Sequence, residues 1–147
     1  HDLGVVAEIC DDVAVMYAGR IAEYGEAETI FDRPSHPYTI GLFSSLPQIE
    51  AKHLRRSDRL YVIPGMVPRP QEFPSGCRFR SRCEFATDEC SKLPPLESQE
   101  EGHLSACWYA EQVREGTKEK TGPKTDDETV DPEEFLASMN GNLDRAG

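Results

Sequence analysis

The chain has 147 residues, a formal net charge of −11, and 11 residues each of Gly and Pro. Hydrophobic residues make up only 37% of it, which is thin for one large core, because burial must offset the entropy of ordering every residue. Its acidity excludes binding of nucleic acid through the phosphates, since that binding requires clustered Lys and Arg. No apolar run is long enough to span a bilayer, and no signal peptide is expected.

The first predicted helix covers residues 2–10, where apolar side chains recur at helical spacing: Leu3, Val6, Ala7 and Cys10. On this stripe, Cys10 is expected to be a small buried hydrophobe rather than a reactive thiol. Residues 13–17 form a short apolar run typical of a buried strand. After a turn at Ala18–Gly19, residues 20–24 predict a second strand, which we place nearer a sheet edge because it is more polar.

Two short helices are expected after this hairpin. The first covers residues 27–31 and ends near Arg33–Pro34. The second starts at about His36, with Pro37 in its first turn, and ends at Pro47. We therefore expect His36 to have a structural role at a helix start. The apolar face of this helix is expected to consist of Tyr38, Leu42 and Leu46.

The C-terminal half has fewer regular patterns. Residues 48–59 are strongly charged and form the best linker candidate, Leu60–Ile63 predicts a strand, and prolines keep residues 64–76 extended. Residues 111–147 carry ten Asp or Glu against five Lys or Arg, so we expect a mostly disordered acidic tail. Near its end, Asp131–Pro132 predicts the start of a short helix.

Four of the five cysteines fall within one segment: Cys77, Cys83, Cys90 and Cys107. In a reducing compartment such a group indicates a metal site, and in an oxidising one it indicates two disulfides. Four thiolates can complete a tetrahedral zinc site or hold a four-iron cluster. Zinc cysteines usually come in pairs about two to four residues apart, and neither inner gap here is that short. The spacing favours an iron–sulfur cluster, while zinc, disulfides and free thiols stay open.

The opening heptapeptide, from His1 to Ala7, resembles the switch-loop region of ABC ATPases, and residues 15–21 with the break at Gly25 continue the match. The resemblance implies that His1 contacts the γ-phosphate of ATP and helps to hold the attacking water, as a catalytic and ATP-binding residue. It also implies ATP and Mg²⁺ as cofactors of the parent protein. The sequence contains no G-x-x-x-x-G-K-[ST] loop, so we expect this chain alone to be inactive toward ATP. Because its first residue is His rather than Met, we expect the chain to start inside a longer protein or to have a processed start.

Further motifs narrow the resemblance to the ATP-binding subunits of oligopeptide/dipeptide importers. They are Arg33-Pro34-Ser35-His36-Pro37-Tyr38-Thr39, Ile63-Pro64-Gly65, Pro74-Ser75-Gly76, Pro94-Pro95-Leu96, Gly102-His103 and Cys107-Trp108. Some members of that family hold a [4Fe–4S] cluster, and the resemblance implies that its ligands here are Cys77, Cys83, Cys90 and Cys107.

The surroundings of these cysteines are expected to assist binding. Three arginines would offset the negative charge, and three aromatic residues would exclude solvent: Arg78, Arg80, Arg82, Phe79, Phe85 and Trp108. Zinc is the alternative metal, and His103 is a weaker ligand candidate that we expect behind the ligands or at the surface.

The implied parent protein lies peripherally on the cytoplasmic face of the membrane. Its partners are transmembrane permease subunits, a homologous ATPase subunit and, indirectly, an extracytoplasmic solute-binding protein, and nucleic acid is not among them. Two rival hypotheses are a non-enzymatic zinc-binding interaction module and a secreted disulfide protein.

We predict an α+β fold. Residues 1–47 would form the C-terminal end of an ABC ATPase α/β domain, with a helix, a β-hairpin and two helices. A linker at 48–59 would lead to a small, loop-rich metal- or cluster-binding domain at 60–110. Residues 111–147 would form the acidic tail.

Overall fold

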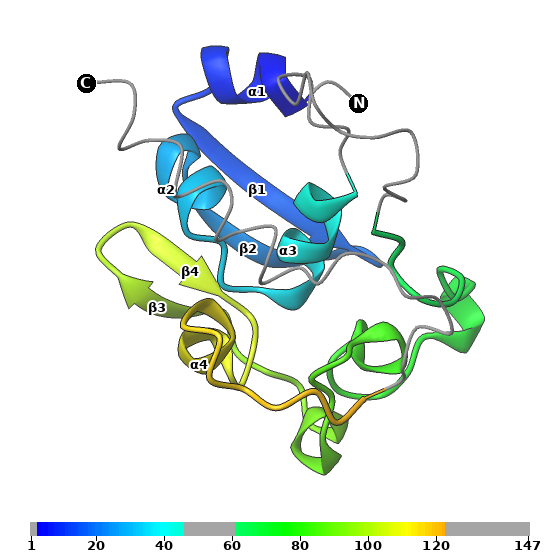
Figure 1. Cartoon of the computed structure of the whole chain (residues 1–147). Coiled ribbons are helices and arrows are strands. Elements are labelled where there is room, and N and C mark those ends of the chain that lie inside the picture. The colour runs from blue at the N-terminus through cyan, green and yellow to red at the C-terminus, as the bar shows by residue number, and fades with distance from the viewer. Residues whose placement is uncertain (1–2, 46–60, 123–147) are drawn as a thin grey trace, which may run out of the picture.

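The computed structural model describes residues 3–45 and 61–122, and these form a four-stranded antiparallel sheet with short helices packed around it. The strand order is β1-β2-β4-β3, and Figure 1 shows the two hairpins lying beside one another. The strands are β1 (Asp12–Tyr17), β2 (Arg20–Glu26), β3 (Glu97–Glu100) and β4 (His103–Ser105). This arrangement confirms the predicted α+β class.

The first hairpin is confirmed, and its turn explains its register. Tyr17 pairs with Arg20 across a two-residue connection. Ala18 and Gly19 both have positive φ, at 50° and 76°, which matches the twist of a tight hairpin turn. The second hairpin was not predicted, and its turn contains Gly102 at φ 75°.

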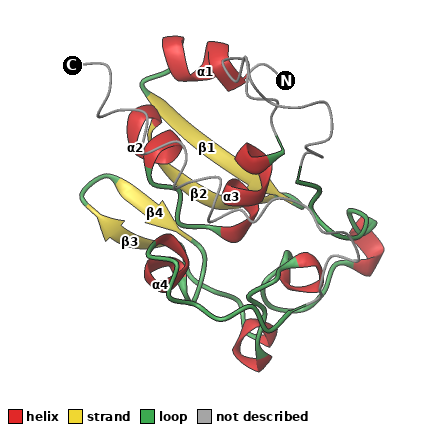
Figure 2. Cartoon of the chain, viewed as in Figure 1, coloured by secondary structure: helices red, strands yellow, loops and turns green. Residues whose placement is uncertain are grey.

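Four α-helices accompany the sheet (Figure 2): α1 (Leu3–Ile9), α2 (Ala27–Asp32), α3 (Pro37–Ser44) and α4 (Ala110–Arg114). Three of them confirm the predicted helices, and α2 contacts both strands of the first hairpin while α3 contacts β2. Buried residues of α3 include Ile40 and Phe43, whereas the expected Tyr38 and Leu42 are only partly buried. Among the described residues, no helix is long and apolar enough to cross a membrane.

The prediction that the second strand lies nearer a sheet edge is wrong. β2 is an inner strand, because β4 pairs with its free side, with Glu23 opposite Ser105 and Tyr24 opposite Leu104. Its polar residue Glu23 is completely buried rather than solvated. Residues that are about eighty positions apart therefore share one sheet.

The predicted strand at Leu60–Ile63 is also wrong for the part that the structure describes, residues 61–63. Tyr61 and Ile63 pack instead on Gly41 of α3, where the absent side chain leaves room for them. The Arg82 guanidinium donates hydrogen bonds to the carbonyl oxygens of Ile63, Pro64 and Gly65. This segment is therefore held by a side chain rather than by a neighbouring strand.

Cys10 is exposed, so its predicted burial is wrong. The apolar stripe of α1 is largely uncovered, with Ile9 73% and Val5 46% exposed. Only its first residue, Leu3, packs against a core cluster, and the main contacts of α1 are with α2.

The predicted tail begins with regular structure. α4 carries Ala110 and Val113 into the core, at 3% and 4% exposure, and their burial explains why the helix is ordered despite its charged neighbours. Gly122 still donates a backbone hydrogen bond to the Glu84 carbonyl. His1, the predicted linker 48–59 and the predicted helix near 131 lie outside the described residues.

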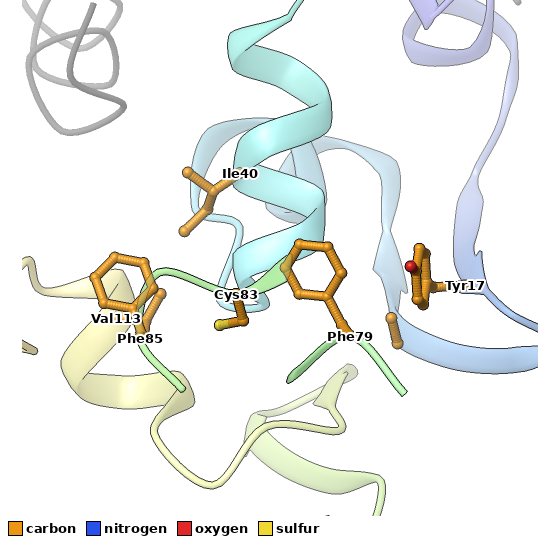
Figure 3. Packing of buried hydrophobic residues seen from close by; sticks show 7 residues of the cluster. Tyr17, Ile40, Phe79, Cys83, Phe85 and Val113 are labelled. Carbon is orange, nitrogen blue, oxygen red and sulfur yellow. The ribbon is translucent and has the colours of Figure 1, made fainter. Parts of the chain in front are cut away.

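The main core cluster joins the first hairpin and α3 to the cysteine-bearing segment and α4 (Figure 3). Its buried members are Tyr17, Ala22, Ile40, Phe79, Cys83, Phe85 and Val113. Tyr17 and Phe79 meet edge to face, with ring centroids 5.2 Å apart, a geometry that contributes about 0.5–1.5 kcal/mol beyond burial. The two halves of the chain are thus packed around one core as well as sharing one sheet.

Candidate functional site

All four clustered cysteines line one small pocket, which we call the cysteine pocket. Three lie on irregular backbone: Cys77 in a loop, Cys83 directly after the 3₁₀ turn Arg80–Arg82, and Cys90 within the 3₁₀ turn Asp88–Ser91. Cys107 follows β4. The structure therefore brings together the four residues that the spacing singled out.

A close backbone contact joins the first and third cysteines. The Cys77 N–H donates to the Cys90 carbonyl oxygen at 3.0 Å. The preceding Gly76 has φ 74°, and a Cβ there would lie 2.6 Å from the Cys90 carbonyl oxygen. Two independent reasons therefore require glycine at position 76: its positive φ and the close approach of the two loops.

Three of the four sulfur atoms accept a hydrogen bond from the backbone two residues further on. The donor to Cys77 is Phe79, the donor to Cys83 is Phe85, and the donor to Cys107 is Tyr109, where N and Sγ are 3.5 Å apart. Such N–H groups stabilise the negative thiolate, which is the form that binds metals. The repeated Cys-x-aromatic pattern was a signal in the sequence that the spacing argument overlooked.

Without a cation, the grouping disfavours thiolates. Burial raises the pKa of Cys107 to about 12, and the neighbouring Cys77 and Cys90 add to the rise. Burial likewise raises the pKa of Cys83, with the other three cysteines contributing. Sulfur atoms that repel one another as anions form a site that a positively charged group would stabilise.

The side chains around the pocket do not form a ready-made site for a single metal ion. Within residues 3–45 and 61–122, no three Cys, His, Asp or Glu side chains are placed to hold one metal ion. The enclosed volume of about 10 Å³ is no more than one water molecule needs, so a cluster requires the cysteine loops to move apart.

The expected surroundings are partly present. Phe79 and Phe85 are buried beside the cysteine pocket, and Trp108, 37% exposed, lines its rim. Of the three arginines, Arg80 is the one that lowers the pKa of Cys77 and lines the pocket. Arg78 and Arg82 instead bind backbone carbonyls, those of Ala18 for Arg78 and of residues 63–65 for Arg82.

A buried polar network beside this pocket was missed by the sequence reasoning. Glu23 Oε1 accepts hydrogen bonds from Ser35 N at 2.6 Å, Ser35 Oγ at 2.9 Å and His103 Nε2 at 2.7 Å. Its Oε2 accepts one from His36 N at 3.0 Å. Burial alone would raise the pKa of Glu23, but these bonds, led by that of His103, hold it below its ordinary value.

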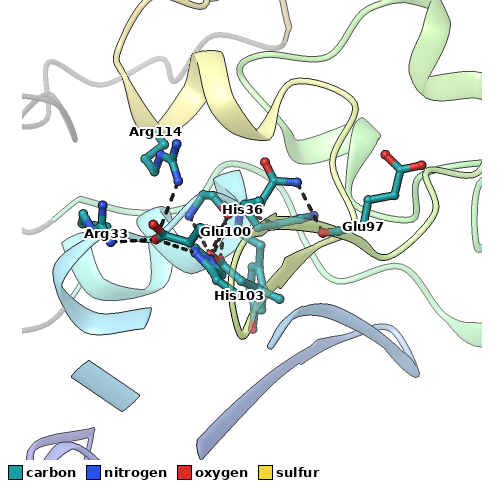
Figure 4. Close-up of polar contacts among 10 residues, drawn as sticks. Arg33, His36, Glu97, Glu100, His103 and Arg114 are labelled. Atoms are coloured by element: carbon teal, nitrogen blue, oxygen red, sulfur yellow. Dashed lines mark hydrogen bonds and ion pairs between the residues drawn. The ribbon is translucent and has the colours of Figure 1, made fainter. Parts of the chain in front are cut away.

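His103 is completely buried, so its alternative placement at the surface is excluded. Its Nε2 faces Glu23, and its Nδ1 lies 3.6 Å from Glu100 Oε1. Figure 4 shows Arg33 and Arg114 converging on the same Glu100 carboxylate, at 2.7 Å and 3.8 Å. His103 thus links β4 to β2 and is not placed as a metal ligand with the cysteines.

His36 has the structural role that was predicted. It is the N-cap of α3, and its Nδ1 accepts a hydrogen bond from Tyr38 N at 3.0 Å. Burial lowers the pKa of His36 to about 4, against the attraction of Glu23, so the ring is neutral at physiological pH.

Comparison with known proteins agrees with the resemblance drawn from the sequence. Residues 22–90 match the family described as the C-terminal region of oligopeptide/dipeptide transporters. The oligopeptide transport ATP-binding protein OppD of Haemophilus influenzae is 48% identical over 110 residues, which are 75% of this chain and 33% of that protein. A putative peptide import ATP-binding protein of Brucella ovis is 51% identical over 110 residues, 73% of this chain and 32% of that protein.

The OppD protein of Escherichia coli is 47% identical over 108 residues, 74% of this chain and 31% of that protein. The chain therefore spans about a third of the length of the curated relatives it matches. Residues 22–90 thus match the C-terminal region of oligopeptide/dipeptide transporters, within a chain whose relatives are ATP-binding proteins of peptide transport.

Proposed function

We propose that this chain is the C-terminal part of the ATP-binding subunit of an ABC importer that couples ATP hydrolysis to uptake of peptides or related small solutes. The observation that carries the proposal is the combined match of residues 22–90 to the transporter family and of about three-quarters of the chain to peptide-transport ATP-binding proteins. The parent would bind ATP and Mg²⁺ and sit peripherally on the cytoplasmic membrane face. It would contact permease subunits and a second ATPase subunit.

In this proposal His1 is the γ-phosphate contact of the parent. A neutral imidazole can donate a hydrogen bond to a phosphate whose charge rises during transfer. In the parent protein, His1→Ala should slow ATP hydrolysis about 10²–10³-fold while leaving nucleotide affinity nearly unchanged. The matched control is His53→Ala, in the predicted linker. Full hydrolysis by His1→Ala would contradict the assignment.

Transport is tested in cells that carry the parent gene. Deletion should abolish uptake of a radiolabelled peptide, the intact gene should restore it, and the His1→Ala gene should not. Restored uptake by the His1→Ala gene would exclude coupling through this residue.

We further propose that Cys77, Cys83, Cys90 and Cys107 hold a [4Fe–4S] cluster. The convergence of their sulfur atoms on one pocket supports this, together with the backbone N–H groups directed at three of them. When bound, the cluster supplies a covalent cross-link among loops with few apolar residues. The chain contributes four thiolates, the N–H groups that stabilise them, and Phe79 and Phe85, which keep water away.

The cluster is tested on the 147-residue chain purified without oxygen. Iron and acid-labile sulfide should each reach about four per chain. Replacing any one of the four cysteines by Ser should lower both, whereas Cys10→Ser is the matched control and should change neither, because Cys10 is exposed and away from the pocket. A colourless protein with one zinc per chain, or with no metal, would overturn the cluster.

A further inference from the structure

A second, larger cavity lies between the first hairpin and the cysteine-bearing segment. Its volume is about 360 Å³, within the range of small-molecule sites. We call it the arginine pocket, since Arg20 of β2 and Arg78 beside Cys77 both line it. It shares His36, Cys77, Phe79 and Pro94 with the cysteine pocket, and the other three cysteines do not line it.

The charge of this pocket opposes that of the whole chain. The chain has a net charge of −11, yet the residues that line the pocket include two arginines and no Asp or Glu. Neither Arg20 nor Arg78 forms an ion pair with a described carboxylate. Arg78 is steadied by a hydrogen bond to the Ala18 carbonyl and by stacking on Phe73, 4.6 Å from the ring centroid. Two positive groups without a counterion among the described residues favour an anionic ligand.

Most of the other residues that line the pocket are apolar. Phe79 is buried, whereas Leu93, Leu96 and Ile21, which also line the pocket, are 48%, 39% and 40% exposed. Exposed aliphatic side chains gathered around a cavity lose contact with water when an apolar ligand enters. The pocket therefore combines an anion-binding end with an apolar surface.

We propose that the arginine pocket binds a small amphiphilic organic anion, with its carboxylate or phosphate against Arg20 and Arg78 and its apolar body against Phe79 and Leu93. The volume suits a ligand of drug-like size rather than an inorganic ion. A bound ligand contacts the hairpin and the cysteine-bearing segment together and so stabilises their packing. This inference does not rest on the importer assignment or on the cluster.

The test uses two fluorescent probes that share one apolar body. 8-Anilinonaphthalene-1-sulfonate carries the anionic group, and N-phenyl-1-naphthylamine lacks it. Arg20→Gln should weaken binding of the anionic probe about tenfold, the effect of one lost charge-assisted contact, and leave the neutral probe nearly unchanged. Arg69→Gln is the matched control, because Arg69 is exposed and lies outside the pocket, and it should change neither affinity.

A second variant addresses the apolar wall. Leu93→Ser should weaken the binding of both probes to the same extent. Because Leu93 is exposed, this substitution leaves the fold intact. Octanoate or octyl phosphate should displace the anionic probe from the unmodified chain, and their relative potency distinguishes a carboxylate from a phosphate ligand. Equal displacement by octanol, or an anionic-probe affinity that Arg20→Gln leaves unchanged, would overturn the proposal.

Discussion

Glu23→Gln is the substitution that best tests how the two halves of the chain are held together. The Glu23 carboxylate is completely buried and accepts four hydrogen bonds, at 2.6, 2.7, 2.9 and 3.0 Å. Glutamine has the same shape but only one acceptor oxygen. Its amide group would therefore point donors at the N–H of either Ser35 or His36, and His103 would lose its negative partner.

The expected cost follows from these contacts. Each buried group that is left without a hydrogen-bond partner costs about 1–3 kcal/mol, and more where the lost partner was charged. A domain of this size has a total stability of about 5–15 kcal/mol, so the variant should be severely destabilised. The same carboxylate makes stability pH-dependent. Its folded-state pKa is lowered from 4.5, so its contribution is present above that value and is lost as pH falls through the folded pKa.

Urea denaturation of the chain at neutral pH measures the cost, with the exposed Glu28→Gln as the matched control. Hydrogen exchange should show faster opening at Tyr24 and Leu104, where β2 pairs with β4. In a double-mutant cycle, Glu23→Gln and His103→Gln should be strongly non-additive, because they remove the same interaction. A loss below about 1 kcal/mol would refute the view that this buried carboxylate joins the two halves.

Three other predictions follow from single residues. The lowered pKa of His36 should cost the folded chain about 3 kcal/mol of unfolding free energy as pH falls from 6.5 to about 4, because the unfolded chain binds the His36 proton first. His36→Asn should keep the N-cap of α3 and remove this loss. Equal pH profiles of the unfolding free energy for the two proteins would contradict the prediction. Gly76→Ala should prevent cluster assembly, because the added Cβ meets the backbone of the loop at Cys90. Gly102→Ala has a similar φ but open space around it, so it should lower the stability by only about 1 kcal/mol and leave the iron content unchanged. Equal iron content in both variants would contradict this prediction. In the metal-free chain at pH 8, iodoacetamide should label the exposed Cys10 well before the buried cysteines, and mass spectrometry showing uniform labelling would disagree.

Local patterns in the sequence predicted local structure well. The hairpin, α2 and α3 follow from short-range signals: an apolar run, a turn at Ala18–Gly19 and a proline in a first helical turn. The four cysteines were singled out by type and number, and they do converge on one pocket. Each of these features depends on residues close in the sequence or on a rare residue type.

Long-range pairing could not be read in the same way. β4 has only three residues and no apolar alternation strong enough to predict a strand, and its pairing with β2 changed a presumed edge strand into an inner one. Glu23 looked like a solvated residue because its burial depends on His103 and on the loop at Ser35. For Cys10 the prediction erred in the opposite direction, because it was expected to be buried and is exposed. An apolar stripe on a helix is buried only where another element covers it.

We propose that four cysteines of this peptide-transporter-like chain form one iron–sulfur site. Native mass spectrometry of the chain, purified and sprayed without oxygen, tests it most directly, because intact mass distinguishes a cluster from zinc and from free thiols. We expect a main species that carries four iron and four sulfide, and the loss of that species in Cys83→Ser but not in Cys10→Ser. A main species that carries a single zinc ion, or two disulfides, would contradict it.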